Sequence, residues 1–170
     1  FNVDMIFNVP HQSEASLRRD LDQLCELGVD QISWYPPMPA DTTERAMSRT
    51  MGRVDFSHER DYYELIRRRL SPEYRPASAW CFSRKPAAID EYIVDHDEYL
   101  GIGSGAFSYL DGSTWSTTFS INRYLALIEH GRPAITAGRA LSLREQVQYD
   151  FLIQLFGGRL DLAALRARYG

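Results

Sequence analysis

The sequence predicts an α/β fold in its first part and a mostly helical second part that contains a small sheet. The first observation is a strand–helix–strand succession near the start, and the second is a series of amphipathic helical segments toward the end. A strand, a helix, a glycine turn and a second strand form a βαβ unit, which implies parallel strands with a right-handed crossover. We place the boundary between Arg84 and Tyr99, which gives expected domains of residues 1–90 and 91–170.

The βαβ unit opens the chain. A buried strand is expected over Val3 to Val9, where apolar and β-branched residues lead to a proline. The helix that follows has Ser13 as N-cap, a leucine stripe at helical spacing, and Gly28 at its end. The second strand is expected over Val29 to Tyr35, because two prolines halt it.

A long polar link and a second helix complete the first part. The link runs from Met38 to Asp55, and links of this length are often functional. The helix is expected over Ser57 to Leu70, and a third strand over Ala77 to Phe82. The acidic segment "IDEYIVDHDEYLG" is expected to form a short extended or turn segment. The predicted apolar side of the helix consists of Tyr63, Ile66 and Leu70.

The second part is expected to begin with a hairpin and end with helices. The hairpin joins Gly105–Leu110 to Thr114–Phe119, because "LDGS" supplies an Asp-Gly turn. A helix over Ile121 to Glu129 follows. The next helix begins after Ser142, whose spacing to Glu145 is that of a capping box. A last short helix is capped by Asp161 and contains "LAALRARYG".

Composition excludes several classes of protein. The chain has 170 residues, 44% of them hydrophobic and 25% charged, which is typical of a globular protein. Its net charge of −4 argues against a general nucleic-acid surface. No apolar run is long enough to span a membrane. The start is not a signal peptide and is interpreted as a strand of a longer protein. The 2 cysteines form no CxxC pair, and a cytoplasmic setting is expected.

The stretch "YLGIGSGAFSYLDG" contains three alternating glycines, Gly101, Gly103 and Gly105. A dinucleotide-binding fingerprint needs its third glycine one residue later and a helix after it, whereas a strand is expected here. The glycines are therefore interpreted as a bend where the backbone passes close to a neighbouring strand or to a flat ligand.

Single polar residues offer further candidates. Asp4 lies within an apolar strand, where it either caps a turn or binds a ligand near the carboxyl end of the strand. The four histidines form no metal-binding pattern, so no metal site is expected. Aromatic residues gather in "SWYPPM" and "AWCFSR", either as core or as a flat hydrophobic pocket.

Four stretches together carry a resemblance that covers nearly the whole chain. They are "VDMIFNVPHQ", "DQISWYP", "YLGIGSGAFSYLDG" and "LSLREQVQYDFLIQLFGGRLDLAALRARYG". In this order they resemble the later half of the oxygen-independent coproporphyrinogen III oxidase group of radical S-adenosylmethionine (SAM) proteins, which includes heme chaperone-like members. The resemblance implies the second half of a partial (β/α)6 barrel, followed by a C-terminal accessory domain.

The resemblance also implies a function for the parent protein. Such proteins bind a [4Fe–4S] cluster and SAM, accept electrons from a donor, and act on a tetrapyrrole in heme biosynthesis. In the oxidase a 5′-deoxyadenosyl radical starts the conversion of propionates to vinyls with loss of CO2. Catalytic residues stay unknown. The residues implied to lie near SAM are Asp4, Trp34, Tyr35 and Pro36, and the substrate-pocket candidates are Phe82, Gly101, Gly103, Gly105 and Phe107.

Departures from the family pattern leave alternatives open. The cluster-binding C-x-x-x-C-x-x-C motif is absent, so this chain alone is expected to be inactive. Phe107 stands where chaperone-like relatives often have histidine. A heme-binding chaperone or a heme-modifying relative is the alternative function, with His11, His96, His130 and Met38 as candidate heme ligands. A third interpretation makes the last helices a protein-interaction module.

Overall fold

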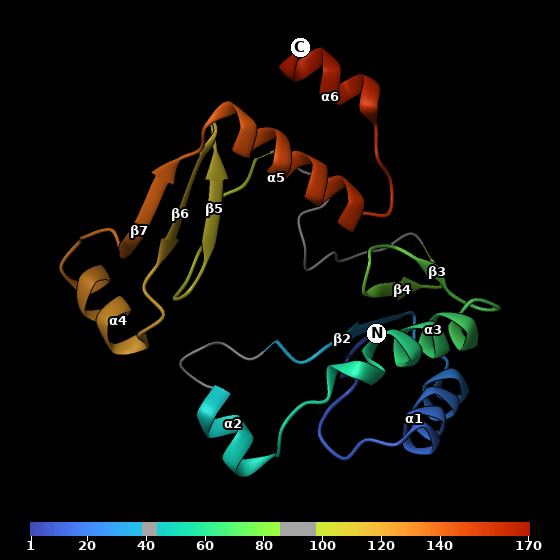
Figure 1. Ribbon diagram of the computed structural model, residues 1–170. Helices are drawn as coiled ribbons and strands as arrows, with labels where there is room; N and C mark the ends of the chain where they lie inside the picture. Colours follow the sequence, from blue (N-terminus) through green and yellow to red (C-terminus); the bar gives the residue numbers. More distant parts are fainter. Residues whose placement is uncertain (39–43, 86–97) are drawn as a thin grey trace. The chain divides into compact units, whose positions relative to one another are not determined.

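The computed structural model describes residues 1–38, 44–85 and 98–170. The chain divides into two compact units, Phe1–Asp90 and Glu91–Gly170 (Figure 1). One sheet has the strand order β1-β2-β4-β3, and the other has the order β5-β6-β7. The identities given above to the two predicted domains stay predictions.

The predicted βαβ unit is confirmed. It consists of β1 (Asn2–Ile6), α1 (Glu14–Leu27) and β2 (Gln31–Tyr35), and the two strands pair in parallel. β1 ends earlier than expected, because Asn8 and His11 adopt left-handed conformations with φ of 58° and 67°. Such residues cannot continue a pleated strand.

A mixed sheet replaces the third strand expected over Ala77 to Phe82. The prediction is confirmed only for Cys81 and Phe82, because the segment turns back on itself and forms β3 (Arg75–Pro76) and β4 (Cys81–Ser83). The backbone nitrogen of Ala77 donates to the carbonyl of Cys81 at 2.8 Å, which closes the turn. β4 then pairs antiparallel with both β2 and β3.

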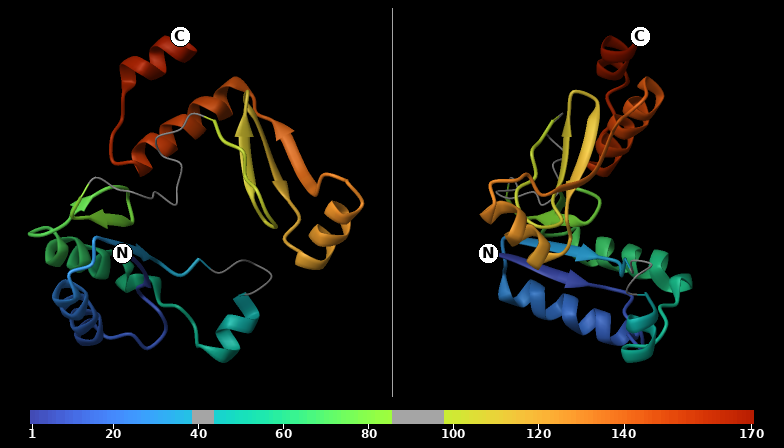
Figure 2. Two further views of the ribbon diagram at one scale, coloured as in Figure 1. Left: turned by 180° about the vertical axis from the view of Figure 1, so that it is seen from behind. Right: turned by 90° about the vertical axis from the view of Figure 1, so that its left-hand side faces the viewer.

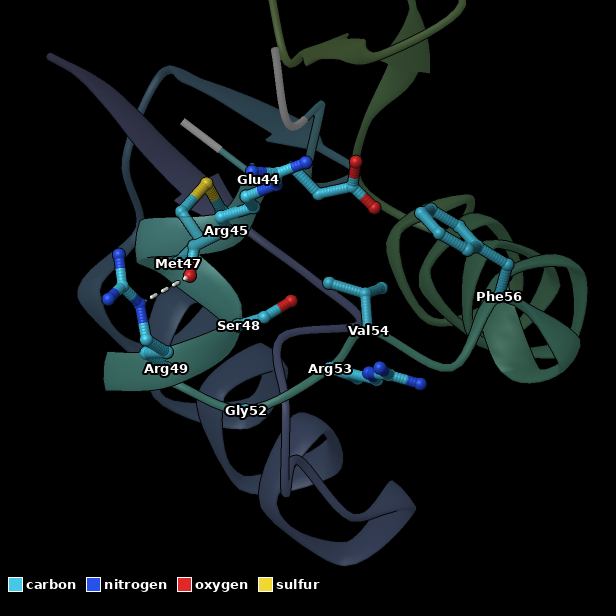
Figure 3. A pocket seen from close by; sticks show the side chains of 9 residues that line it. All are labelled: Glu44, Arg45, Met47, Ser48, Arg49, Gly52, Arg53, Val54 and Phe56. Atoms are coloured by element: carbon cyan, nitrogen blue, oxygen red, sulfur yellow. Dashed lines mark hydrogen bonds between the residues drawn. The ribbon is translucent and has the colours of Figure 1, made fainter. Parts of the chain in front are cut away.

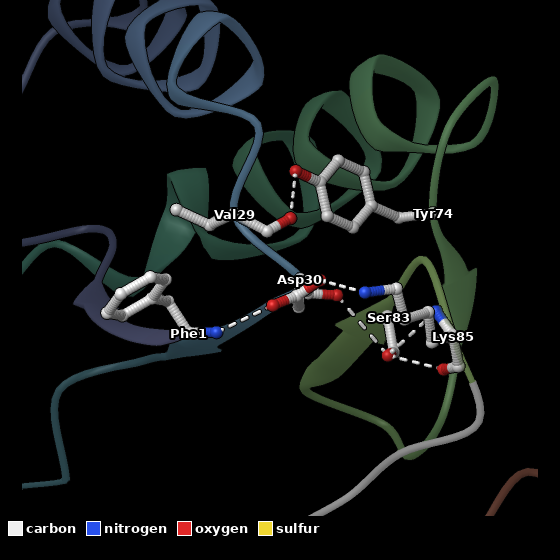
Figure 4. A network of polar contacts seen from close by, with 6 residues as sticks. All are labelled: Phe1, Val29, Asp30, Tyr74, Ser83 and Lys85. Carbon is white, nitrogen blue, oxygen red and sulfur yellow. Dashed lines mark hydrogen bonds and ion pairs between the residues drawn. The ribbon is translucent and has the colours of Figure 1, made fainter.

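Asp30 joins the start of β2 to the end of β4 (Figure 4). Its carboxylate accepts a hydrogen bond of 2.8 Å from Lys85 Nζ. This bond lowers the pKa of Asp30 below its ordinary value of 3.8. Nearby, the hydroxyl of Tyr74 donates to the carbonyl of Val29 at 2.9 Å.

Two helical segments in the first unit differ from expectation. The polar link contains α2 (Glu44–Thr50), which has no buried residue and therefore no apolar periodicity to predict it. The next helix is a 3-10 turn, η1 (Phe56–His58), followed by α3 (Glu59–Leu70). The buried aromatic residue of α3 is Tyr62, whereas Tyr63 is half-buried and donates from its hydroxyl to the carbonyl of Ala79.

The core of the first unit lies between α1, α3 and one face of the sheet (Figure 2). β1 contributes Val3 and Met5 to this face, while the alternate residues of the strand point away from it. A strand expected to be buried on both sides is thus only half-buried. The core consists of Phe7, Leu17, Leu21, Leu24, Ile32, Trp34, Tyr62, Ile66, Leu70, Tyr74 and Phe82.

The second unit contains the predicted hairpin. β5 (Phe107–Leu110) and β6 (Ser113–Thr117) pair antiparallel, and Asp111 and Gly112 both have positive φ, as a type I′ turn requires. A further strand, β7 (Ile135–Ala140), was not predicted, because its small and charged residues are all exposed and show no alternation. The helices are α4 (Ile121–Glu129), α5 (Leu143–Phe156) and α6 (Leu162–Tyr169).

Tyrosines attach α5 to the sheet and to α6. The ring of Tyr149 stacks on that of Tyr109 at 4.3 Å, and its hydroxyl lies 2.9 Å from that of Tyr99. One residue later, the buried carboxylate of Asp150 accepts from the hydroxyl of Tyr169 at 2.5 Å and lies 3.0 Å from Arg168. None of the described helices is both long and apolar enough to cross a bilayer.

The capping box of α5 provides a prediction about pH. Glu145 accepts from the backbone and hydroxyl of Ser142 and from Arg139, and these bonds lower its pKa from 4.5 to about 2. A lowered carboxyl pKa stabilises the folded state above the unfolded pKa, and this stabilisation is lost as pH falls through the folded pKa. Glu145→Gln should therefore lower Tm at pH 6, and its difference from wild type should shrink between about pH 4.5 and pH 2.

Thermal unfolding of both proteins across this pH range measures the effect. Glu129→Gln, on exposed α4, is the control and should show no such convergence. A constant difference in Tm from pH 6 to pH 2 would show that Glu145 contributes through packing alone.

Candidate functional site

The face of the first sheet opposite the core carries mostly polar side chains. Register pairs Asp4 of β1 with Ser33 of β2, and Ser33 with Cys81 of β4, so these three residues form a row across the sheet. Strand alternation places this row on the face that contributes nothing to the core cluster. The other residues of this face are Asn2, Ile6, Gln31, Tyr35 and Ser83.

Asp4 is exposed on this face, although the strand that contains it was predicted to be buried. Only alternate residues of β1 face the helices, so the carboxylate keeps access to solvent. Nδ2 of Asn2 donates to Oδ1 of Asp4 at 2.9 Å, and no hydrogen bond to Oδ2 is found among the described residues. A carboxylate in this position can accept hydrogen bonds from hydroxyl groups of a ligand.

The residues predicted beside Asp4 occupy different environments. Tyr35 is half-buried on the same face as Asp4, and its ring lies 5.9 Å from that of Trp80. Pro36, directly after β2, is buried. The side chains of Trp34 and Phe82 are 0% and 1% exposed within the core, on the opposite face. Ligand-binding roles for these two residues stay predictions, and their burial argues against them.

The loops after β1 and β2 meet at the carboxyl edge of the parallel strands, which is the usual ligand-binding edge of such sheets. The amide of Asn8 donates to the carbonyl of Asp55 at 3.0 Å. The ring of His11 lies so close to Gly52 that a Cβ there would be 3.2 Å from its Nε2. Tyr62 donates to the carbonyl of Gln12 at 3.1 Å, which fixes the first loop to α3.

A cavity of about 740 Å³ lies within the segment that follows β2 (Figure 3). Figure 3 shows Ser48 of α2 directed toward Val54. Phe56 lies beyond Val54, on the side away from Ser48. Arg49 extends away from this space and donates to the carbonyl of Arg45 at 3.2 Å. The lining is Glu44, Arg45, Met47, Ser48, Arg49, Gly52, Arg53, Val54 and Phe56.

A second cavity of about 740 Å³ lies beside β3 and β4. Two of its basic residues already have partners, since Arg84 binds Glu73 and Lys85 binds Asp30. The guanidinium of Arg84 also lies 4.8 Å above the ring of Tyr74. These contacts join the end of β4 to the residues before β2 and after α3.

The glycine-rich stretch belongs to the second unit and packs closely against its own sheet. A Cβ at Gly101 would lie 2.0 Å from the carbonyl oxygen of Phe107, and a Cβ at Gly105 would lie 2.9 Å from the ring of Phe119. Gly103 and Gly105 also have positive φ, of 114° and 74°. Gly101 and Gly105 therefore lie against the protein's own backbone and Phe119, whereas Gly103 has open space beside it and is favoured by its positive φ alone.

Phe107 and Phe119 form an exposed aromatic pair beside these glycines. Their ring centroids are 5.9 Å apart in an edge-to-face arrangement, and the side chains are 56% and 71% exposed. Exposed aromatic rings of this kind are suited to contact a flat apolar ligand. Roles for Gly101, Gly103, Gly105 and Phe107 in a substrate pocket stay predictions.

The candidate heme ligands are dispersed. His11 is exposed at the loop after β1, and Met38, 62% exposed, follows β2. His130 is exposed in the second unit, and its Nδ1 lies 2.7 Å from the carbonyl of Ala126. His96 lies outside the described residues.

The described residues do not fit an iron–sulfur cluster. They contain no group of three or more His, Cys, Asp or Glu side chains that could hold a metal ion. Cys25 packs against the core from α1, where burial raises the pKa of its thiol, and Cys81 lies in β4. A cluster in the parent protein would therefore need ligands from elsewhere.

Sequence reasoning missed several residues of the candidate site. Asn2 and Ser33 were not singled out, although alternation of polar and apolar residues in β1 could have identified Asn2. Phe119 was missed because its pairing with Phe107 depends on the hairpin register. No signal in the sequence identified the cavity around α2.

Comparisons with known proteins show what the chain is similar to. No protein-family model matches the chain. The chain is 27% identical to the heme chaperone HemW of Mycobacterium tuberculosis over 75% of this chain and 34% of the relative. It is 22% identical to the oxygen-independent coproporphyrinogen III oxidase of Cereibacter sphaeroides over 99% of this chain and 41% of the relative. The chain thus spans about a third to two fifths of the length of these relatives.

A solved structure has the same fold. The coproporphyrinogen III oxidase HemN from Escherichia coli, described as a radical SAM enzyme, matches with a TM-score of 0.73 at 16% identity. The match covers 99% of this chain and 43% of HemN. The resemblance to the oxygen-independent coproporphyrinogen III oxidase group with its heme chaperones is confirmed, and so is the predicted α/β fold.

Proposed function

We propose that this chain is part of a radical SAM oxidoreductase that acts on a tetrapyrrole in heme biosynthesis, by oxidative decarboxylation of propionates. The similarity to an oxygen-independent coproporphyrinogen III oxidase over 99% of the chain carries the proposal. The parent would bind SAM and a [4Fe–4S] cluster and would take electrons from a donor in the cytoplasm. The two cysteines of this sequence cannot form the C-x-x-x-C-x-x-C motif, so the cluster ligands would come from another part of the parent protein.

The first unit would hold the adenosyl part of SAM on its polar face. Asp4 is exposed there, one of its carboxylate oxygens accepts no bond among the described residues, and the other is held by Asn2. The carboxylate would accept hydrogen bonds from the ribose hydroxyls. Tyr35 and the backbone at Pro36, nearer the carboxyl edge, would contact the adenosyl group. When bound, SAM and the cluster supply the radical that removes hydrogen from the substrate.

The second unit would contact the tetrapyrrole. Phe107 and Phe119 present exposed aromatic surface, and the glycines beside them hold the backbone close to this pair. A flat macrocycle gains apolar contact by stacking on such rings. The arrangement is consistent with a substrate that is flat and largely apolar.

Formation of 5′-deoxyadenosine tests the proposed function. The complete parent protein, reconstituted anaerobically with iron and sulfide, should produce 5′-deoxyadenosine from SAM and a reductant, and more of it when a propionate-bearing tetrapyrrole is added. Chromatography measures the nucleoside. A reconstituted protein that contains the cluster but yields no 5′-deoxyadenosine would rule out the enzyme function.

A heme chaperone is the second candidate, and a specific observation favours it. Over 75% of its own length, this chain is 27% identical to HemW of Mycobacterium tuberculosis, which is named as a heme chaperone. Exposed His11 and Met38 follow neighbouring parallel strands and could bind heme iron. Heme titration should then shift the Soret band, and His11→Ala should remove the shift, while His58→Ala serves as the control. A shift that survives replacement of His11, His96, His130 and Met38 would exclude this function.

A further inference from the structure

Asn2 lies beside Asp4 on the polar face and connects β1 to β2. Its Nδ2 donates to Oδ1 of Asp4 at 2.9 Å, and the hydroxyl oxygen of Ser33 lies 3.5 Å from its Oδ1. An ionised carboxylate only accepts hydrogen bonds, so the amide nitrogen of Asn2 must face Asp4 and the amide oxygen must face the Ser33 hydroxyl. The three side chains therefore form a directed series in which Ser33 donates to Asn2 and Asn2 donates to Asp4.

Ser33, at one end of this series, is buried, whereas Asp4, at the other end, is accessible to solvent. Ser33 is 1% exposed and lies directly opposite Asp4 in the parallel register. Asp4 and Asn2 are exposed. An exposed aspartate has several accessible rotamers, and a hydrogen bond to one oxygen restricts them. The bond from Asn2 thus sets the direction in which the second oxygen, Oδ2, can accept.

We propose that Asn2 is a positioning residue, which holds the Asp4 carboxylate for a ligand that carries neighbouring hydroxyl groups. This inference rests on the proposed function, in which Asp4 accepts the ribose hydroxyls of an adenosyl ligand. Preorganised acceptors bind more tightly because the ligand does not have to order them. Removal of Asn2 should therefore weaken the recognition of the hydroxyl groups and leave other ligand contacts unchanged.

The experiment compares two ligands and three variants in the complete parent protein with its cluster in place. The ligands are S-adenosylhomocysteine and its 2′,3′-dideoxy analogue, and calorimetry gives the dissociation constant of each. Wild type should prefer the hydroxyl-bearing ligand, and Asn2→Ala should reduce this preference roughly tenfold. Asn2→Asp keeps the side-chain shape but cannot donate when ionised, so it should lose the preference as well. Asn122→Ala, on exposed α4, is the control and should behave as wild type.

Each outcome has a distinct meaning. An equal loss of affinity for both ligands, with a lower Tm, would show that Asn2 only stabilises the strand, and the proposal would be overturned. A wild-type preference that Asn2→Ala leaves intact would overturn this inference but not the proposed function. If wild type binds both ligands with equal affinity, Asp4 does not accept the ribose hydroxyls and this inference is overturned, whereas the proposed function is decided separately by the formation of 5′-deoxyadenosine.

Discussion

Replacement of Asp4 by alanine in the complete parent protein is expected to lower the affinity for SAM roughly a hundredfold, because two charge-assisted hydrogen bonds to the ribose are lost. The yield of 5′-deoxyadenosine at limiting SAM should fall by a similar factor. Asp4 is exposed and contributes nothing to the core cluster, so the variant should still fold. Equilibrium binding of SAM to the reconstituted protein, together with chromatography of the nucleoside, measures both effects.

Asp61→Ala is the matched control for Asp4. Asp61 is also exposed, but it lies in the first turn of α3 rather than on the polar face of the sheet. Its replacement should change stability slightly through the helix dipole and leave SAM binding unchanged. Wild-type affinity in Asp4→Ala would show that this carboxylate does not contact the cofactor, whatever the activity of the parent.

Replacement of Trp34 by alanine should destabilise the first unit by about 4 kcal/mol, whereas replacement by phenylalanine should cost less than about 1 kcal/mol. The indole is 0% exposed, and its Nε1 has no hydrogen-bond acceptor among the described residues. Alanine removes the apolar contacts and leaves a cavity. Phenylalanine keeps most of the contacts and removes a buried donor whose desolvation is uncompensated. Urea unfolding followed by circular dichroism measures both free energies of unfolding.

Leu27→Ala is the control for the Trp34 variants. Leu27 is apolar and belongs to α1, but it is 73% exposed, so its loss should cost less than about 0.5 kcal/mol. Equal destabilisation by alanine and phenylalanine at position 34 would mean that the indole N–H has an acceptor in the folded protein. A small effect of both would mean that Trp34 is not part of the core, and a role in ligand binding would regain support.

Local signals were sufficient for many elements of this fold. Gly28 ends α1 with φ of 65°, Ser142 and Glu145 form the predicted capping box, and Asp161 caps α6 through a bond to Ala164. The Asp111–Gly112 turn likewise determines the hairpin. These features depend on residues close in sequence, whose preferred dihedrals and short hydrogen bonds are properties of the residues themselves.

Features without a local signal were missed or misplaced. β4 is held by partners far away in sequence, since Phe82 pairs with Ile32 and Arg84 donates to the carbonyl of Asp30, and β3 in turn pairs only with β4. β7 pairs with β6 although its residues show no alternation. Strand pairing of this kind is decided by the neighbouring strand rather than by intrinsic preference.

The sequence by itself determined the βαβ unit, the helix caps, the hairpin turn and the resemblance to a protein family. Only the tertiary structure decided which aromatic and polar residues are exposed and which are buried. Asp4 and Trp34 both lie in strands with apolar neighbours, yet the first is exposed beside Asn2 and the second is buried under the helices. The reason is physical: a strand places successive side chains on opposite faces, and the face that is buried depends on where α1 and α3 pack.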